Sequence, residues 1–263
     1  MAYKPGCTSF FGGASQPNGG ITMADRSNSQ YDELYTQLSD IEAELQHYKA
    51  HFRNKVVLCN CDDPFESNFF KYFAMNFNDL GLKKLITISY DDSPIMGKEL
   101  PLLPVATPLN KKAYKIELSA VSSINGDGIA DLTDVELFLK NNYCARWLLN
   151  GNGDFRTYEC IGIMSKVDII VTHPPLSLLD KYIELLINYR KKFIIIGNQS
   201  TFDDPLTGSL LQEEKMWLGI SRPCGGYDFR LSEKTPISTA AAADSKNNFV
   251  NVNGMCWLTN CKC

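Results

Sequence analysis

The stretch VDIIVTHPPLSLLDKYIELL, residues 167–186, changes its hydrophobic pattern once. Its first part is an apolar, β-branched run, which is typical of a buried strand. Its last part spaces apolar residues as on one face of a helix. Between them lies His173-Pro174-Pro175, and prolines fix the direction of the backbone where a strand ends. We therefore predict a buried strand, a rigid turn and a helix that packs back onto the sheet.

Similar units flank this stretch. Apolar strands that end in polar turns are predicted at residues 55–64, 83–92 and 192–200, and shorter strands at 214–220 and 255–260. Helices are predicted at residues 65–81 and at 34–52, where an apolar stripe starts at Leu34 and leaves Glu44 on another face. Near-continuous apolar strands that alternate with helices predict an α/β fold, with a mostly parallel central sheet and helices on both faces.

The composition divides the chain into a leader and one domain. Residues 1–28 are rich in Gly, Ser, Pro and Asn without periodicity, and we expect a flexible leader there. The chain has 263 residues, of which 44% are hydrophobic, which is enough for one good core. We therefore expect residues 29–263 to form one domain. Within it, residues 100–150 break the alternation and are predicted to be an insertion.

Charge and cysteine content limit the classes of function. The net charge is −4 and the sequence pI is about 5.5, which counts against a strong non-specific nucleic-acid binder. Basic clusters at residues 83–84, 111–112 and 190–192 still leave room for a local basic strip. The nine cysteines form no C-x-x-C pair, and the sequence has no signal peptide or apolar run of membrane length. We expect free thiols in a reducing, cytoplasmic compartment, and no membrane partner.

The insertion contains a segment with the oxygen spacing of a calcium loop. Five side chains fall at loop positions 1, 3, 5, 9 and 12: Ser123, Asn125, Asp127, Asp131 and Asp134. Gly128 falls at position 6, where such loops turn sharply. The first position lacks an acid, so the predicted calcium site is weak. A turn of Asn and Gly that caps a helix explains the same residues.

Polar turns follow four of the predicted strands: NCDDP, SYDD, THPP and GNQS. The carboxyl ends of parallel strands meet at one edge of a sheet, where α/β proteins bind their ligands. A strand followed by X-Pro-Pro-aromatic is the signature of amino-group methyltransferases. Two acceptors, an Asn or Asp side chain and the first proline's carbonyl, orient the weakly nucleophilic amino group toward the methyl donor. The aromatic residue stacks on a flipped base.

Seven stretches together resemble the EcoRI-type adenine-specific DNA methyltransferase family: residues 35–48, 56–86, 151–156, 168–182, 191–200, 217–220 and 256–260. The resemblance extends from about Asp32 to Asn260. It implies a Rossmann-like methyltransferase fold and the cofactor S-adenosylmethionine. It also implies methyl transfer to the exocyclic amino group of adenine, with double-stranded DNA as the partner.

The resemblance assigns cofactor contacts to Tyr35-Thr36, to Asn60-Cys61-Asp62-Asp63-Pro64 and to Asp154-Phe155. The first segment would cover the methionine end of the cofactor. The second matches the first cofactor loop of the family, although it lacks the usual glycine-rich form. The third pair would face the cofactor's adenine. A solvated acidic turn and an ordinary Gly-Asp turn are the structural alternatives for the second and third segments.

The catalytic turn departs from the family's Asn-Pro-Pro-Phe, because it reads His173-Pro174-Pro175-Leu176. A neutral imidazole accepts one hydrogen bond with a geometry unlike that of an amide, and a protonated one accepts none. Leu176 offers no aromatic face, which removes about 1–3 kcal/mol of base stacking. We expect an adenine-specific DNA methyltransferase with weak transfer. The alternative is a catalytically inactive homologue that binds the cofactor or a partner, and for His173 alone, a histidine that fills a turn.

Overall fold

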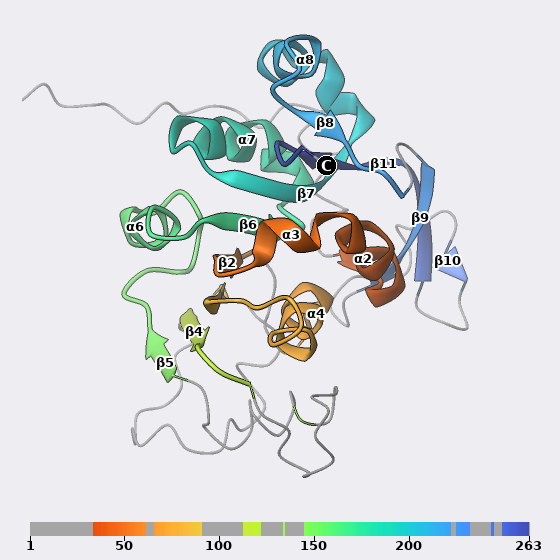
Figure 1. Cartoon of the computed structure of the whole chain (residues 1–263). Coiled ribbons are helices and arrows are strands. Elements are labelled where there is room, and N and C mark those ends of the chain that lie inside the picture. Colours follow the sequence, from red (N-terminus) through yellow and green to blue (C-terminus); the bar gives the residue numbers. More distant parts are fainter. Residues whose placement is uncertain are drawn as a thin grey trace, which may run out of the picture.

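The computed structural model describes residues 34–61, 66–90, 113–121, 134, 145–221, 225–231, 243–244 and 249–262. The predicted leader, residues 1–28, lies outside this part of the chain. The described strands form one mixed, eleven-stranded sheet, in which the order along the main path is β1-β9-β11-β7-β6-β2-β3-β4-β5 (Figure 1). The α/β class predicted from the sequence is confirmed.

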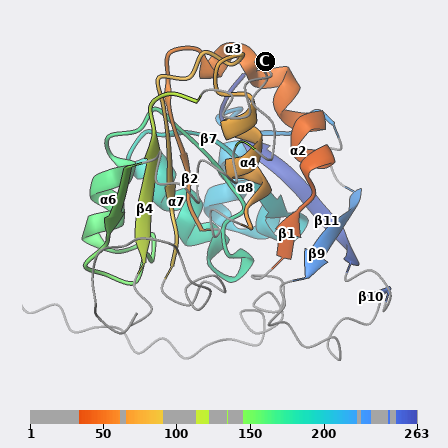
Figure 2. The ribbon, with the colours of Figure 1, turned by 90° about the horizontal axis from the view of Figure 1, so that it is seen from below.

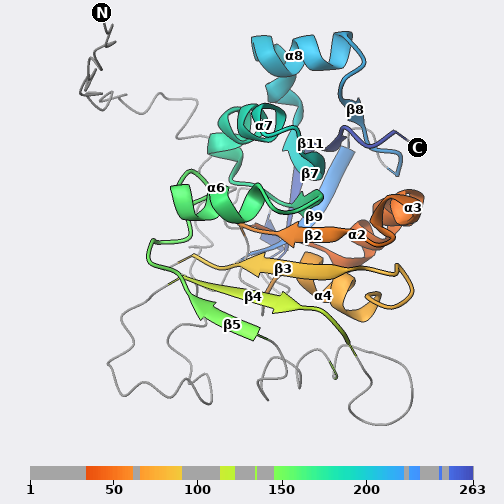
Figure 3. The ribbon, with the colours of Figure 1, turned by 60° about the vertical axis from the view of Figure 1, so that its left-hand side comes forward.

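The centre of the sheet is parallel. It consists of β2 (Val56–Cys59), β3 (Lys84–Ile88), β6 (Ile169–Thr172) and β7 (Lys192–Asn198). Parallel ladders join β2 to β3, β2 to β6 and β6 to β7. Every residue of β6 is buried, which explains its unbroken apolar sequence. The carboxyl ends of these strands share one edge, on the left in Figure 3.

Both flanks of the sheet are antiparallel, so the prediction of a mostly parallel sheet was wrong. One flank holds β4 (Tyr114–Leu118) and β5 (Ala145–Leu148). The other holds β1 (Leu34–Thr36), β9 (Gly225–Leu231) and β11 (Phe249–Thr259), with β8 (Trp217–Leu218) and β10 (Ala243–Asp244) paired to β11. A parallel neighbour needs a long crossover, usually a helix. No helix is described between β8 and β11, and these strands pair as antiparallel neighbours instead.

Helices cover both faces of the sheet. One face carries α2 (Leu38–Leu45) and α4 (Asn68–Met75), and the other carries α6 (Tyr158–Met164) and α7 (Leu179–Asn188) (Figures 1 and 2). The remaining helical elements are η1 (Gln46–Tyr48), α3 (Lys49–Phe52), η3 (Leu176–Leu178), η4 (Gln199–Asp203) and α8 (Pro205–Gln212).

Two predicted helices differ from the observed ones at their ends. Leu34 belongs to strand β1 because it pairs with Leu231 of β9, so the helix predicted from Leu34 starts four residues later, at Leu38. Helix α4 ends at Met75, before the expected stop at Gly81. Turns fill the interval, and Gly81 closes them with a φ of 61°, in the left-handed region that glycine adopts without strain.

Aromatic side chains fill the core that α4 forms with the sheet and with α3. Phe69 packs edge-on against Trp257 of β11, with ring centroids 5.8 Å apart, and Phe73 packs against Phe52 at 5.0 Å. None of the described cysteines is joined in a disulfide. In the described part of the chain, no helix is long and apolar enough to cross a membrane.

Candidate functional site

The predicted cofactor loop and the predicted catalytic turn lie beside each other at the carboxyl edge. They follow β2 and β6, which are neighbours in the parallel sheet. The hydroxyl of Thr172, the last residue of β6, donates a hydrogen bond to the backbone oxygen of Asn60. Asn60 is only 3% exposed. Asp62, Asp63 and Pro64 of the same loop lie outside the described residues.

Tyr182 fixes the side chain of Asn60 by a hydrogen bond. Its hydroxyl donates a hydrogen bond of 2.6 Å to the Asn60 side-chain oxygen. Burial raises the pKa of Tyr182 well above its ordinary value, so the phenol is a neutral donor. The same ring packs edge-on against Phe155, with centroids 4.9 Å apart. Tyr182 therefore joins two segments predicted to bind the cofactor. From the sequence it was placed on the helix predicted after the His-Pro-Pro turn and assigned no role.

Cys61 gives the cofactor loop a backbone bend of the kind that glycine usually supplies. Its φ is 73°, in the left-handed region that side chains disfavour. Its side chain is half-buried, whereas Asn60 before it is buried. The loop thus has a turn typical of glycine-rich loops although its sequence contains no glycine.

Gly153 sets the position of Asp154 and Phe155. Its φ is 84°, and a Cβ atom on it would lie 2.1 Å from the backbone oxygen of Ser89. Ser89 directly follows β3, and its hydroxyl accepts a hydrogen bond of 3.0 Å from the backbone N–H of Tyr114. The segment before Asp154 therefore lies against the end of β3, which only a glycine at residue 153 allows.

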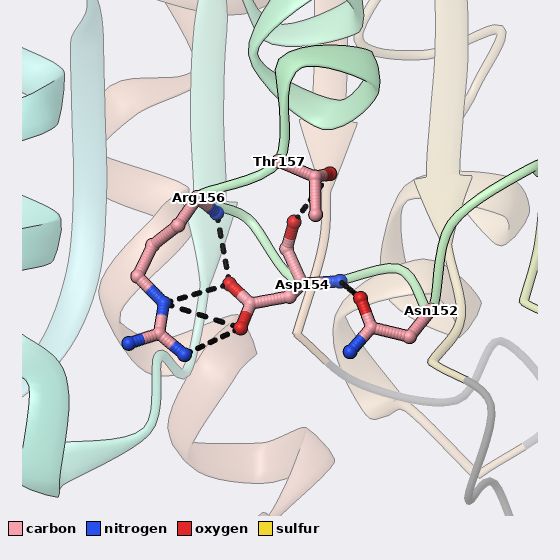
Figure 4. Close-up of polar contacts among 4 residues, drawn as sticks. All are labelled: Asn152, Asp154, Arg156 and Thr157. Carbon is pink, nitrogen blue, oxygen red and sulfur yellow. Dashed lines mark hydrogen bonds and ion pairs between the residues drawn. The ribbon is translucent and has the colours of Figure 1, made fainter. Parts of the chain in front are cut away.

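Arg156 neutralises Asp154 in the structure (Figure 4). Its guanidinium donates to both carboxylate oxygens, at 2.5 Å for the closest pair, and its backbone N–H donates at 2.9 Å. The hydrogen bonds from the Arg156 side chain are the main cause that holds the pKa of Asp154 below its usual value, and burial opposes them. The hydroxyl of Thr157 donates to the backbone oxygen of Asp154 at 2.8 Å and fixes the turn before α6.

The predicted catalytic turn packs against the antiparallel flank. Strands β1 and β9 pair Thr36 with Phe229, and both residues contact His173. The Thr36 hydroxyl lies 3.4 Å from Nδ1 of His173, within hydrogen-bond distance. The rings of His173 and Phe229 are tilted by 40°, with centroids 5.5 Å apart. His173 is 5% exposed. Phe229 is an aromatic neighbour of the turn that sequence reasoning missed, because β9 was not predicted.

The rest of the turn is also enclosed. Pro174 is buried and Pro175 half-buried. The backbone oxygen of Pro175 accepts from the N–H of Leu178 at 2.9 Å, which starts the helical segment η3. Leu176 is 4% exposed and belongs to the hydrophobic core. The position where the family carries a stacking aromatic is therefore a core position in this structure.

Asn68 connects the first helix after the cofactor loop to the segment of Tyr35 and Thr36. Its side-chain amide donates a hydrogen bond of 2.8 Å to the backbone oxygen of Thr36. Tyr35 is buried, at 6% exposed. The structure thus brings Tyr35-Thr36, Asn60-Cys61, Asp154-Phe155 and the predicted catalytic turn to one region of the sheet edge.

The predicted calcium loop is described at one position only. Ser123, Asn125, Asp127 and Asp131 lie outside the described residues, and Asp134 is fully buried. Among the residues that the structure describes, no three His, Cys, Asp or Glu side chains gather as metal ligands. Calcium binding is not supported.

The chain matches a protein family and is similar to several known proteins. The model of the family described as adenine-specific methyltransferase EcoRI matches residues 22–263. The Type II methyltransferase M.EcoRI of Escherichia coli is 39% identical over 241 residues, which cover 88% of this chain and 66% of that protein. No solved structure matches the chain.

Two Mycoplasma proteins are also similar. M.MpnI of Mycoplasma pneumoniae is 30% identical over 236 residues, and M.MgeORF184P of Mycoplasma genitalium is 28% identical over 237 residues. Both are named Type II methyltransferases, and the matched region spans 61% of each. The chain thus spans slightly less than two thirds of the length of the relatives it matches.

Proposed function

Since this chain belongs to the EcoRI family of adenine-specific methyltransferases, we propose that it methylates the exocyclic amino group of adenine in double-stranded DNA with S-adenosylmethionine. We place this activity in one domain, residues 29–263. The observation that carries the proposal is the hydrogen bond from Thr172 to Asn60, because it joins the strand before the catalytic turn to the first cofactor loop.

The described residues fit this cofactor. The left-handed bend at Cys61 gives the loop the kind of turn that glycine supplies in other cofactor loops. The partly exposed carboxylate of Asp154 is an acceptor for an adenine amino group, and Phe155 and Tyr182 support it from the core. When bound, S-adenosylmethionine supplies a methyl group that its positively charged sulfur makes electrophilic. Asn60, Cys61, Asp154 and Phe155 would hold it.

His173 would accept a hydrogen from the adenine amino group through Nε2. A neutral imidazole has one donor and one acceptor nitrogen, so Nε2 accepts only when Nδ1 carries the proton. The Thr36 hydroxyl, 3.4 Å from Nδ1, can accept that proton's hydrogen bond and so favour the required tautomer. The carbonyl of Pro174 would supply the second acceptor. Thr36 is thus a positioning residue for His173 in this proposal.

The second candidate function is a methyltransferase homologue that binds the cofactor without transferring a methyl group. Two observations favour it. His173 and Leu176 are both buried. In addition, neither the family's amide nor its aromatic residue is present at the turn. In this case the segments that bind the cofactor would keep their function, while the turn would no longer bind the target adenine.

One pair of measurements separates the two functions. The chain is titrated with S-adenosylmethionine in a calorimeter, and then incubated with the labelled cofactor and mixed duplex DNA. Binding with methyl transfer to adenine supports the enzyme, and binding without transfer supports the inactive homologue. Failure to bind S-adenosylmethionine or its demethylated product would contradict both.

A further inference from the structure

Exposed basic residues line the amino edge of the sheet, opposite the catalytic turn. We call them the basic edge: Arg53, Lys55, Lys83, Lys166, Arg190, Lys192 and Lys262. All are exposed, and each lies in or beside the turn that leads into a parallel strand or out of β11. In Figure 3 this edge lies on the right, with α3 and the C-terminus.

The ladders place these residues in one strip. Val56 pairs with Lys84, so Lys55 and Lys83, one residue earlier, are neighbours. Ile169 pairs with both Val57 and Lys192, which brings Lys166 and Lys192 to the same edge. Lys192 also reaches β11, since its ammonium donates to the backbone oxygen of Asn260 at 3.0 Å. Neighbouring strands are about 4.8 Å apart, so the strip extends roughly 20 Å across the sheet.

Cations at this edge have a structural use, because helices end here and their carbonyls attract positive charge. Lys191 shows it, since its ammonium donates to the backbone oxygens of Ser165 and Val167 at 2.7 and 2.8 Å. The side chains of Lys55, Lys83 and Lys166 differ, because they make no hydrogen bond or ion pair with any described residue. Helix capping therefore does not account for them.

Few acids balance the strip, apart from Glu213 and Glu214 before β8, of which Glu213 is paired with Lys215 at 2.6 Å. Glu117 is already paired with Lys84 and Lys115, at 2.6 and 2.8 Å. Asp168 accepts a hydrogen bond from the backbone of Val56, and Asp79 lies in the turn before β3. The whole chain carries a net charge of −4, so the positive charge of this strip is opposite in sign to that of the whole chain. At the carboxyl edge of the sheet, by contrast, Arg156 is paired with Asp154.

We propose that the basic edge is a second contact surface for duplex DNA, which it holds by the phosphate backbone without reading sequence. The choice of DNA as the partner rests on the proposed function. A duplex that is the substrate is also a polyanion long enough to reach both the carboxyl edge and the basic edge. Protein interfaces bury an apolar centre. Of the large hydrophobic residues that are described and exposed, only Tyr189 adjoins the strip. Spaced lysines and arginines without such a centre suit phosphates better than an acidic protein.

The test measures the affinity for a short, labelled duplex as a function of salt. Each phosphate contact contributes about 0.9 to the slope of log K against log salt. The triple variant Lys55→Gln, Lys83→Gln, Lys166→Gln should therefore lose about 2–3 from that slope, and Lys166→Gln alone about 0.9. Lys181→Gln is the matched control for the single change, because Lys181 is an exposed lysine on α7, away from the edge, and its slope should stay unchanged.

A triple variant with the wild-type slope and an unchanged melting temperature would overturn the proposal. So would displacement of the duplex by poly-glutamate at equal charge concentration, because the surface would then suit an acidic protein equally well. Methyl transfer is measured in parallel. One result would count against the proposed function and still support the basic edge. In it, the chain transfers no methyl group, but the slope of log K against log salt is smaller for the triple variant than for the wild type.

Discussion

The hydroxyl of Tyr182 donates a hydrogen bond of 2.6 Å to the side-chain oxygen of Asn60. Tyr182 lies on the helix after the catalytic turn, and Asn60 begins the cofactor loop, so one bond couples two segments that are 122 residues apart. The Tyr182 ring also contacts Phe155. The geometry of the segments predicted to bind the cofactor therefore depends on a side chain that is fully buried.

Tyr182→Phe should weaken cofactor binding and lower stability. The change keeps the ring against Phe155 but leaves the buried Asn60 oxygen without this donor, which costs about 1–3 kcal/mol. Calorimetric titration with S-adenosylmethionine and thermal unfolding measure the two effects. Tyr189→Phe is the matched control, because Tyr189 is 42% exposed at the end of the same helix. Equal behaviour of the two variants would show that the bond to Asn60 is unimportant.

Gly153→Ala should displace Asp154 and Phe155 and reduce cofactor affinity about tenfold or more, which corresponds to about 1.4 kcal/mol. The added Cβ would lie 2.1 Å from the Ser89 oxygen, at a φ that disfavours side chains. Gly151→Ala is the control from the same motif, since its nearest neighbour would be an ordinary 3.7 Å away. We expect wild-type affinity for Gly151→Ala, and a wild-type affinity for Gly153→Ala would contradict this account.

Arg156→Gln should move the acid limit of cofactor binding to higher pH. Hydrogen bonds from Arg156 lower the pKa of Asp154, so the carboxylate stays charged to a more acidic pH than usual, and any affinity it supplies is lost only as pH falls through that lowered value. Without Arg156, burial remains and raises the pKa. Affinity measured from about pH 4 to pH 8 should then fall earlier on acidification. Asp154→Asn should remove this step, and an acid limit unchanged by Arg156→Gln would show that Asp154 does not control binding.

Thr36→Val should slow methyl transfer, because valine keeps the shape but cannot accept a hydrogen bond from His173 Nδ1. Thr36→Ser keeps the hydroxyl and should restore most of the rate. Single-turnover transfer isolates this step from cofactor affinity, which is measured separately. If serine transfers as slowly as valine, the methyl group of Thr36 matters and the tautomer argument fails.

The central strands were predictable because their sequences are continuous apolar runs, and β6 is buried along its whole length. The flanks were harder to predict. In β4, buried and half-buried residues alternate, a weak signal in a strand of only five residues. Strand β1 depends on pairing with β9, nearly 200 residues away along the chain, so the local apolar stripe suggested a helix through Leu34.

The proximity of the candidate segments was predictable to the extent that the topology determines it. Asn60 follows β2 and His173 follows β6. Because these two strands are parallel neighbours, both residues lie at the same edge of the sheet. Contacts between distant segments were not predictable. Glu44, which helical spacing placed away from the apolar stripe, is fully buried, and its carboxylate accepts hydrogen bonds from the backbone N–H groups of Ile220 and Ser221. No local pattern indicates such a partner.

The most direct test of the central claim is the rate of methyl transfer to adenine in duplex DNA before and after His173→Asn. The wild-type chain should bind S-adenosylmethionine and transfer slowly, because an imidazole at this turn accepts with poorer geometry than an amide. His173→Asn should raise the rate, with Leu176→Phe added as a second step, since Leu176 is a core position that a larger ring would strain. Fast transfer by the wild-type chain that drops on introducing Asn would contradict the account.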